Sequence, residues 1–117
     1  MRINTKAGIS AAVVLHVSVA AFADTTGMCL NMAGMTDDRC ACATEALAGE
    51  VKAEALNLYD AVGTRYLEKL SSGQAMVEAW DGAIAETASE RGVDRHSLLE
   101  TTNDVGKAHR TAILACD

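Results

Sequence analysis

Proline is absent from the 117-residue chain, and its aromatic residues are limited to one tryptophan, two tyrosines and one phenylalanine. The alternation of β-branched and polar residues that is typical of strands is also missing. Alanine, leucine, glutamate and lysine, which favour helices, recur throughout. These features predict an all-α fold, in the form of a small antiparallel bundle of about four helices.

Sequence motifs that accompany common enzyme chemistry are missing as well. The chain contains no G-x-S-x-G, no glycine-rich phosphate loop, no H-E-x-x-H and no C-x-x-C. Acidic residues are abundant, but no two of them are set apart as an acid–base pair. We therefore expect a protein that is not an enzyme, with no catalytic residue and no cofactor.

Residues 1–23 have the pattern of a secretory signal peptide. Arg2 and Lys6 supply the positive start, an uncharged apolar run follows, and a small-x-small site, Ala-Phe-Ala, precedes Asp24. The apolar run of about 16 residues is shorter than the roughly 20 that span a membrane. We expect cleavage before Asp24, which leaves one helical domain over 24–117 in the periplasm or outside the cell. The membrane would be a partner only if the segment stayed uncleaved as an anchor.

The chain is acidic, with a formal net charge of −6 at pH 7. Loss of Arg2 and Lys6 with the signal peptide would make the remaining domain more negative by two charges. Such a surface argues against nucleic acid and anionic membrane as partners. It suits a small exported protein that meets a protein partner not identified by the sequence.

Four cysteines are present, and three of them lie in the stretch MCLNMAGMTDDRCAC at 28–42. An even number of cysteines in an exported chain predicts two disulfides. Antiparallel first and last long helices would bring Cys40 to Cys116, which leaves Cys29 to pair with Cys42. The alternative pairing, Cys29–Cys40 with Cys42–Cys116, is nearly as good.

Three methionines in the same stretch are spaced at i, i+4 and i+7. A helix through Met28, Met32 and Met35 would gather three thioethers on one face. Core packing is the first interpretation, because methionine fills irregular gaps well. The alternative is a metal site for Cu(I), which soft thioether ligands select.

Local signals predict where several helices begin and end. Thr36 and Asp94 are suited to capping helix N-termini, and Gly92 is suited to closing the helix that precedes Asp94. A short helical turn over 28–33 is expected to end at Gly34.

Apolar residues recur at three- and four-residue steps in the later part of the chain, most regularly between positions 98 and 116. The residues expected to pack in the core are Tyr59, Tyr66, Trp80, Leu98, Val105 and His109.

Three functions fit these features. The first is a non-enzymatic interaction or chaperone-like protein in the periplasm. The second is a periplasmic Cu(I)-binding protein that uses the methionine cluster. The third is an accessory subunit of a membrane or periplasmic complex.

Overall fold

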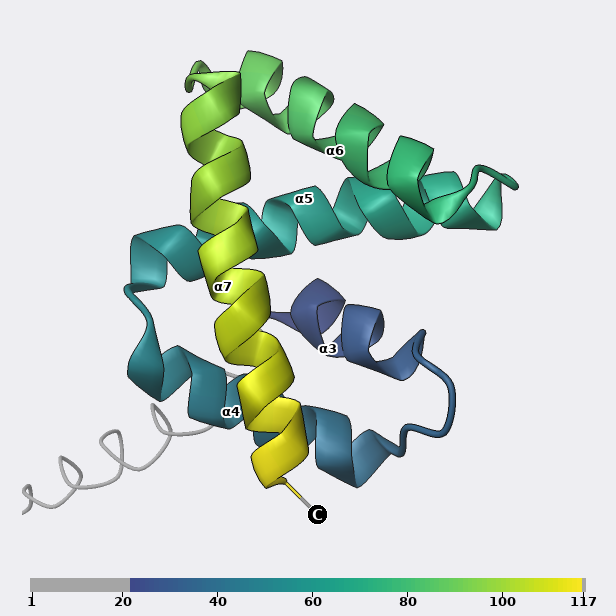
Figure 1. The fold of residues 1–117 in the computed structure, drawn as a ribbon, viewed down its shortest axis with the longest axis vertical. Helices are drawn as coiled ribbons and strands as arrows, with labels where there is room; N and C mark the ends of the chain where they lie inside the picture. Colours follow the sequence, from purple (N-terminus) through teal and green to yellow (C-terminus); the bar gives the residue numbers. More distant parts are fainter. Residues whose placement is uncertain (1–21, 117) are drawn as a thin grey trace, which may run out of the picture.

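A computed structural model describes residues 22–116 of the chain. This part consists of helices without strands (Figure 1), which confirms the all-α prediction. The helices are α3 (Ala23–Leu30), α4 (Asp37–Glu50), α5 (Ala53–Ser71), α6 (Met76–Arg91) and α7 (Arg95–Ala115). The predicted signal peptide lies outside the described residues except for its last two, so its cleavage stays a prediction. Of the helices described, none is long and apolar enough to cross a membrane.

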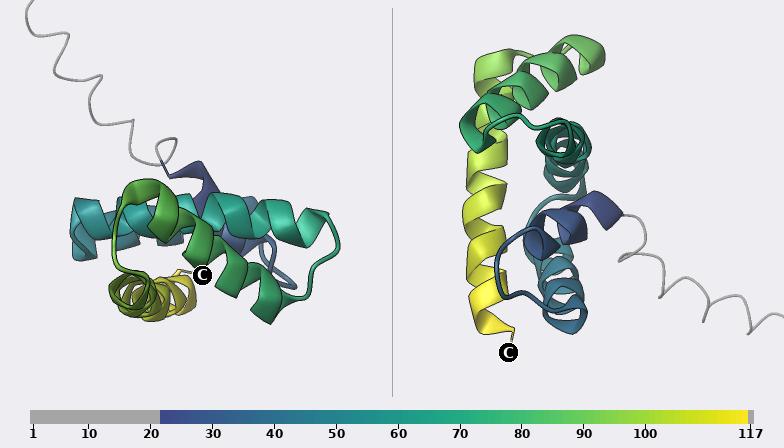
Figure 2. Two further views of the ribbon diagram at one scale, coloured as in Figure 1. Left: turned by 90° about the horizontal axis from the view of Figure 1, so that it is seen from above. Right: turned by 90° about the vertical axis from the view of Figure 1, so that its right-hand side faces the viewer.

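Helices α3, α4 and α5 form one layer, and α6 lies obliquely between this layer and α7 (Figure 2). Helix α3 packs between α4 and α5, and α6 turns back along α5 to form a hairpin. The long helix α7 crosses this layer and contacts α4, α5 and α6 (Figures 1 and 2). The arrangement is roughly that of the small antiparallel bundle expected, with α7 set across its neighbours and α3 added as a fifth helix.

Several helix ends follow from local chemistry. The Thr36 side chain accepts a hydrogen bond from the Arg39 main-chain N–H at 3.2 Å, and Asp94 accepts from Ser97 at 2.8 Å. Gly92 ends α6 in the left-handed conformation, with φ of 66°, which glycine adopts without steric cost. These three residues act at the helix ends where the sequence predicts them.

The first helix departs from the sequence prediction. It spans Ala23–Leu30, whereas the sequence predicts a turn over 28–33. Its start is held by contacts to α5, where Thr25 donates to Asp60 and Thr64 donates to Asp24. These contacts join residues at least 35 positions apart, so no local signal in the sequence indicates them.

The core is divided among three clusters along the molecule. Tyr59 and Val105 are buried with Leu47 and Leu56 in the middle cluster. Leu98 lies in the cluster between α5, α6 and α7, against which Tyr66 and Trp80 pack while half-buried. His109 is buried on α7. The third cluster surrounds the disulfides near the end of α7.

Candidate binding groove

Two disulfides link α3 to α4 and α4 to the end of α7, as the even number of cysteines predicts. They join Cys29 to Cys40 and Cys42 to Cys116. The pairing expected first, Cys40–Cys116 with Cys29–Cys42, is therefore wrong, and the alternative pairing is formed. Residues two apart on a helix point about 200° apart, so Cys40 and Cys42 reach different partners. Which partner each one reaches is set by the packing of α3 and α7 against α4. Cys40 thus faces the last turn of α3, and Cys42 faces the end of α7.

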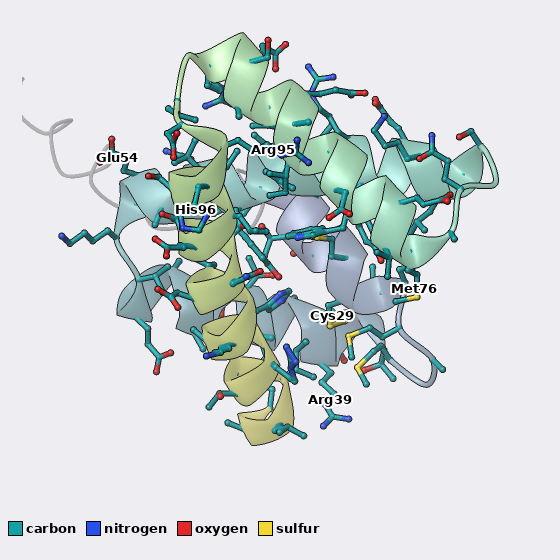
Figure 3. The ribbon with its side chains drawn as sticks, turned by 45° about the horizontal axis from the view of Figure 1, so that its top comes forward. Cys29, Arg39, Glu54, Met76, Arg95 and His96 are labelled. Carbon is teal, nitrogen blue, oxygen red and sulfur yellow. A yellow bond between two sulfur atoms is a disulfide. The ribbon has the colours of Figure 1, made fainter. Side chains whose placement is uncertain are left out.

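A cavity of about 560 Å³ opens where α3, α5, α6 and α7 meet. Its volume falls within the range of small-molecule and side-chain pockets in proteins. Helix α3 and the loop after it supply Met28 and Met32, and α6 supplies Met76, Val77 and Trp80. Figure 3 shows Met76 at the first turn of α6, on the side toward Cys29. We call this cavity the groove.

Aromatic rings build the inner wall of the groove. Trp80 stands edge-on to Tyr66, with ring centroids 5.3 Å apart, and to Tyr59 at 6.4 Å. Such edge-to-face contacts are favourable beyond the burial of apolar area. They favour the orientations that the three rings have in the wall.

The rim of the groove is apolar and exposed. Val77 is 73% exposed and Met76 66%, and Met32 is also exposed. Several exposed apolar residues around one cavity are typical of interaction sites on proteins, whereas single exposed apolar residues are ordinary. The charged residues Asp81 and Arg110 also line the groove.

His109 brings a polar group into this apolar site. Its Nδ1 lies 2.8 Å from the Tyr59 hydroxyl, and burial lowers the pKa of His109 to about 4, so the ring is neutral at pH 7. Burial also raises the pKa of Tyr59, which stays protonated. Within the described residues, the other ring nitrogen, Nε2, is buried without a hydrogen-bond partner. A buried polar group left unpaired costs about 1–3 kcal/mol, which a bound ligand with a matching polar atom would offset.

The structure divides the three methionines that the sequence groups together. Met28 and Met32 line the groove, but Met35 packs against the disulfide cluster. The division follows from the end of α3 at Leu30, which breaks the helical spacing before Met32. Sequence reasoning missed Met76 as a groove residue, because its place depends on α6 meeting α3 in space.

Glycine at position 63 of α5 leaves room for the Met28 side chain of α3. A Cβ atom built on Gly63 would be 2.6 Å from the terminal methyl group of Met28, well inside van der Waals contact. Met28 therefore lies over Gly63 while it lines the groove.

Within residues 22–116, no group of three His, Cys, Asp or Glu side chains is placed to hold a metal ion. The groove combines thioethers, aromatic rings, one imidazole and the charged side chains of Asp81 and Arg110. No protein-family model, no curated protein and no solved structure matches this chain.

Proposed function

We propose that the protein is an exported, non-enzymatic interaction protein that binds an apolar group of a protein partner in the groove. The observation that carries the proposal is the aromatic wall of Tyr59, Tyr66 and Trp80 beneath an exposed apolar rim. Methionines at the rim add side chains that adapt to partners of different shape. This is the chaperone-like role in which one surface serves several ligands.

Export is part of this proposal. Two disulfides within one chain are consistent with an oxidising compartment. Together with the signal-like residues 1–23, they support secretion to the periplasm and cleavage before Asp24. The mature domain would then meet its partner outside the cytoplasm.

The polar atoms of the groove suggest how a partner is oriented. His109 Nε2 is buried and has no hydrogen-bond partner among the described residues. If neighbouring side chains move aside on binding, it can pair with a polar atom next to the apolar group, as donor or acceptor according to its tautomer. An apolar side chain on the aromatic wall and one hydrogen bond to His109 would together fix the partner.

An apolar fluorescent dye, N-phenyl-1-naphthylamine, tests the groove directly. We expect one-to-one binding with energy transfer from Trp80, the single tryptophan of the chain. Val77→Glu places a charge at the rim and should weaken binding at least tenfold. Leu114→Glu is the matched control, because Leu114 is 71% exposed and is not among the residues that line the groove. Equal weakening in both variants, or in neither, would refute the groove as the binding site.

Cu(I) binding is a second candidate function, supported by the ligands that the groove brings together. Met28, Met32, Met76 and His109 all line it, and each offers a donor that Cu(I) accepts. In competition with a colorimetric Cu(I) chelator, Met76→Leu should lower the affinity at least tenfold. Met35→Leu should leave it unchanged, because Met35 packs at the disulfide cluster. An affinity that no groove variant alters would eliminate this candidate.

A further inference from the structure

A carboxylate on α5, that of Asp60, accepts hydrogen bonds from the first turn of α3. One oxygen of Asp60 accepts hydrogen bonds from the main-chain N–H and the hydroxyl of Thr25, both at 2.7 Å. The main-chain N–H of Asp24 approaches the same carboxylate. The N–H and the hydroxyl of Thr25, one residue after Asp24, thus converge on one oxygen of Asp60 at the start of α3.

Asp60 lacks a cationic partner in the part of the chain that the structure describes. The ion pairs of lysine and arginine there join Arg65 to Glu86 and Glu90, and Lys69 to Glu86. Burial raises the pKa of Asp60, and the nearby Asp24 carboxylate adds a like charge. A half-buried carboxylate that is hydrogen-bonded but not neutralised is suited to receive a positive charge.

We infer that Asp60 binds the new α-ammonium group that cleavage before Asp24 creates, and so clamps the mature N-terminus to α5. This inference rests on the export and cleavage included in the proposed function. Hydrolysis adds water across the Ala23–Asp24 peptide bond. The carboxylate leaves with Ala23, and the amine stays on Asp24, where it takes up a proton at neutral pH. The nitrogen that becomes the ammonium belongs to the residue directly before Thr25, whose own N–H donates to Asp60.

The clamp replaces contacts that cleavage removes. In the uncleaved chain the Phe22 carbonyl accepts from the Thr26 main-chain N–H at 3.2 Å, and the Phe22 side chain packs against the middle core cluster. An ion pair between the ammonium group and Asp60 would hold the start of α3 after Phe22 is lost. Because α3 carries Met28 into the groove, the clamp also holds one wall of the binding site.

The surroundings of Asp60 set the strength of the clamp. Beside Asp24 on α3, the charged groups around it line a polar cavity of about 450 Å³ and come from α5 and α6: Arg65, Glu68, Glu90 and Arg91. This cavity is open to water, which screens the ion pair. We therefore expect an effect of a few degrees in melting temperature.

The test uses protein exported with its own leader, purified, and checked by intact mass for a start at Asp24. Part of each sample is acetylated selectively at the α-amine, which removes the charge. Acetylation should lower the melting temperature of the wild type by about 4 °C. It should have little effect in Asp60→Asn, because the asparagine side chain still accepts from Thr25 but carries no charge. Glu68→Gln is the matched control, because it removes the charge of an exposed carboxylate on the same helix. Acetylation should lower its melting temperature as much as that of the wild type.

A second readout needs no variant. NMR of the ¹³C-dimethylated α-amine should give a pKa above the ordinary range of about 7.7–8.0, because the Asp60 carboxylate favours the charged form. Without the clamp, the helix dipole of α3 would lower this pKa instead.

The clamp is overturned if acetylation leaves the melting temperature of the wild type unchanged, or if it lowers the melting temperature of Asp60→Asn as much as that of the wild type. An α-amine pKa that is not raised also overturns it. A mature chain that begins at a residue other than Asp24 also overturns it. In each of these cases the groove proposal stands, because the dye experiment tests it separately.

Discussion

His109 shows how one buried residue connects stability to the binding site. Its ring is held between the Tyr59 hydroxyl and the groove, and burial lowers its pKa to about 4. The ring is therefore neutral at pH 7, and its Nε2 is buried as an uncharged group next to the groove. A protonated ring would place an unpaired charge among apolar side chains.

The lowered pKa of His109 makes the protein less stable in acid. The pKa of His109 is near 6.5 in the unfolded state and about 4 in the folded state. Between these two pH values the unfolded state binds one more proton than the folded state, so the free energy of unfolding falls as the pH falls. The loss approaches about 3 kcal/mol at pH 4. Urea unfolding at several pH values should show a much shallower dependence in His109→Gln. His96→Gln, which alters an exposed histidine, should keep the wild-type dependence, and equal slopes in all three proteins would contradict this account.

At the scale of helices, the two disulfides differ in exposure and in what they join. Cys29 and Cys40 are fully buried, and their bond fixes the end of α3 to the start of α4. Cys42 is exposed, and its bond to Cys116 ties α4 to the end of α7. The second bond closes a loop with a sequence separation of 74, compared with 11 for the first.

Reduction should therefore open the bonds in a fixed order. Limited reduction under native conditions should release Cys42 and Cys116 first, because Cys42 is exposed whereas both cysteines of the other bond are fully buried. Peptide mapping after alkylation checks both the order and the pairing. On the chain-entropy model, removing this long-loop bond with Cys42→Ala and Cys116→Ala should cost about 4 kcal/mol of unfolding free energy. Early labelling of Cys29 or Cys40 would contradict the structure.

At this scale the sequence predicts the helix ends that are determined by interactions between neighbouring residues. Thr36, Gly92 and Asp94 mark helix ends because each acts on main-chain groups within a few residues. The start of α3 and the cysteine pairing depend on contacts between distant residues, which spacing alone leaves open. The same limit hides the groove, because Met76 and Met32 line one cavity only after α6 has folded back along α5.

At the scale of the whole molecule, the groove depends on the packing of several helices, because α3, α5, α6 and α7 all supply residues that line it. The crossing of α7 over α5 brings His109 to Tyr59, and the hairpin of α5 and α6 brings Trp80 to Tyr66 (Figure 1). The buried disulfide holds the loop that carries Met32 close to the groove. Substitutions on the outer face of α4 should therefore leave binding unchanged.

The central claim is that a protein partner occupies the groove in the exported protein. Photo-crosslinking in living cells tests it most directly, with benzoylphenylalanine placed at Val77 on the rim or at Leu114 outside it. Both positions are exposed to about the same degree. We predict a discrete crosslinked species from position 77 that disappears when Trp80→Ala removes part of the aromatic wall, and no such species from position 114. Identical crosslinking from both positions, or a species from 77 that survives Trp80→Ala, would contradict the account.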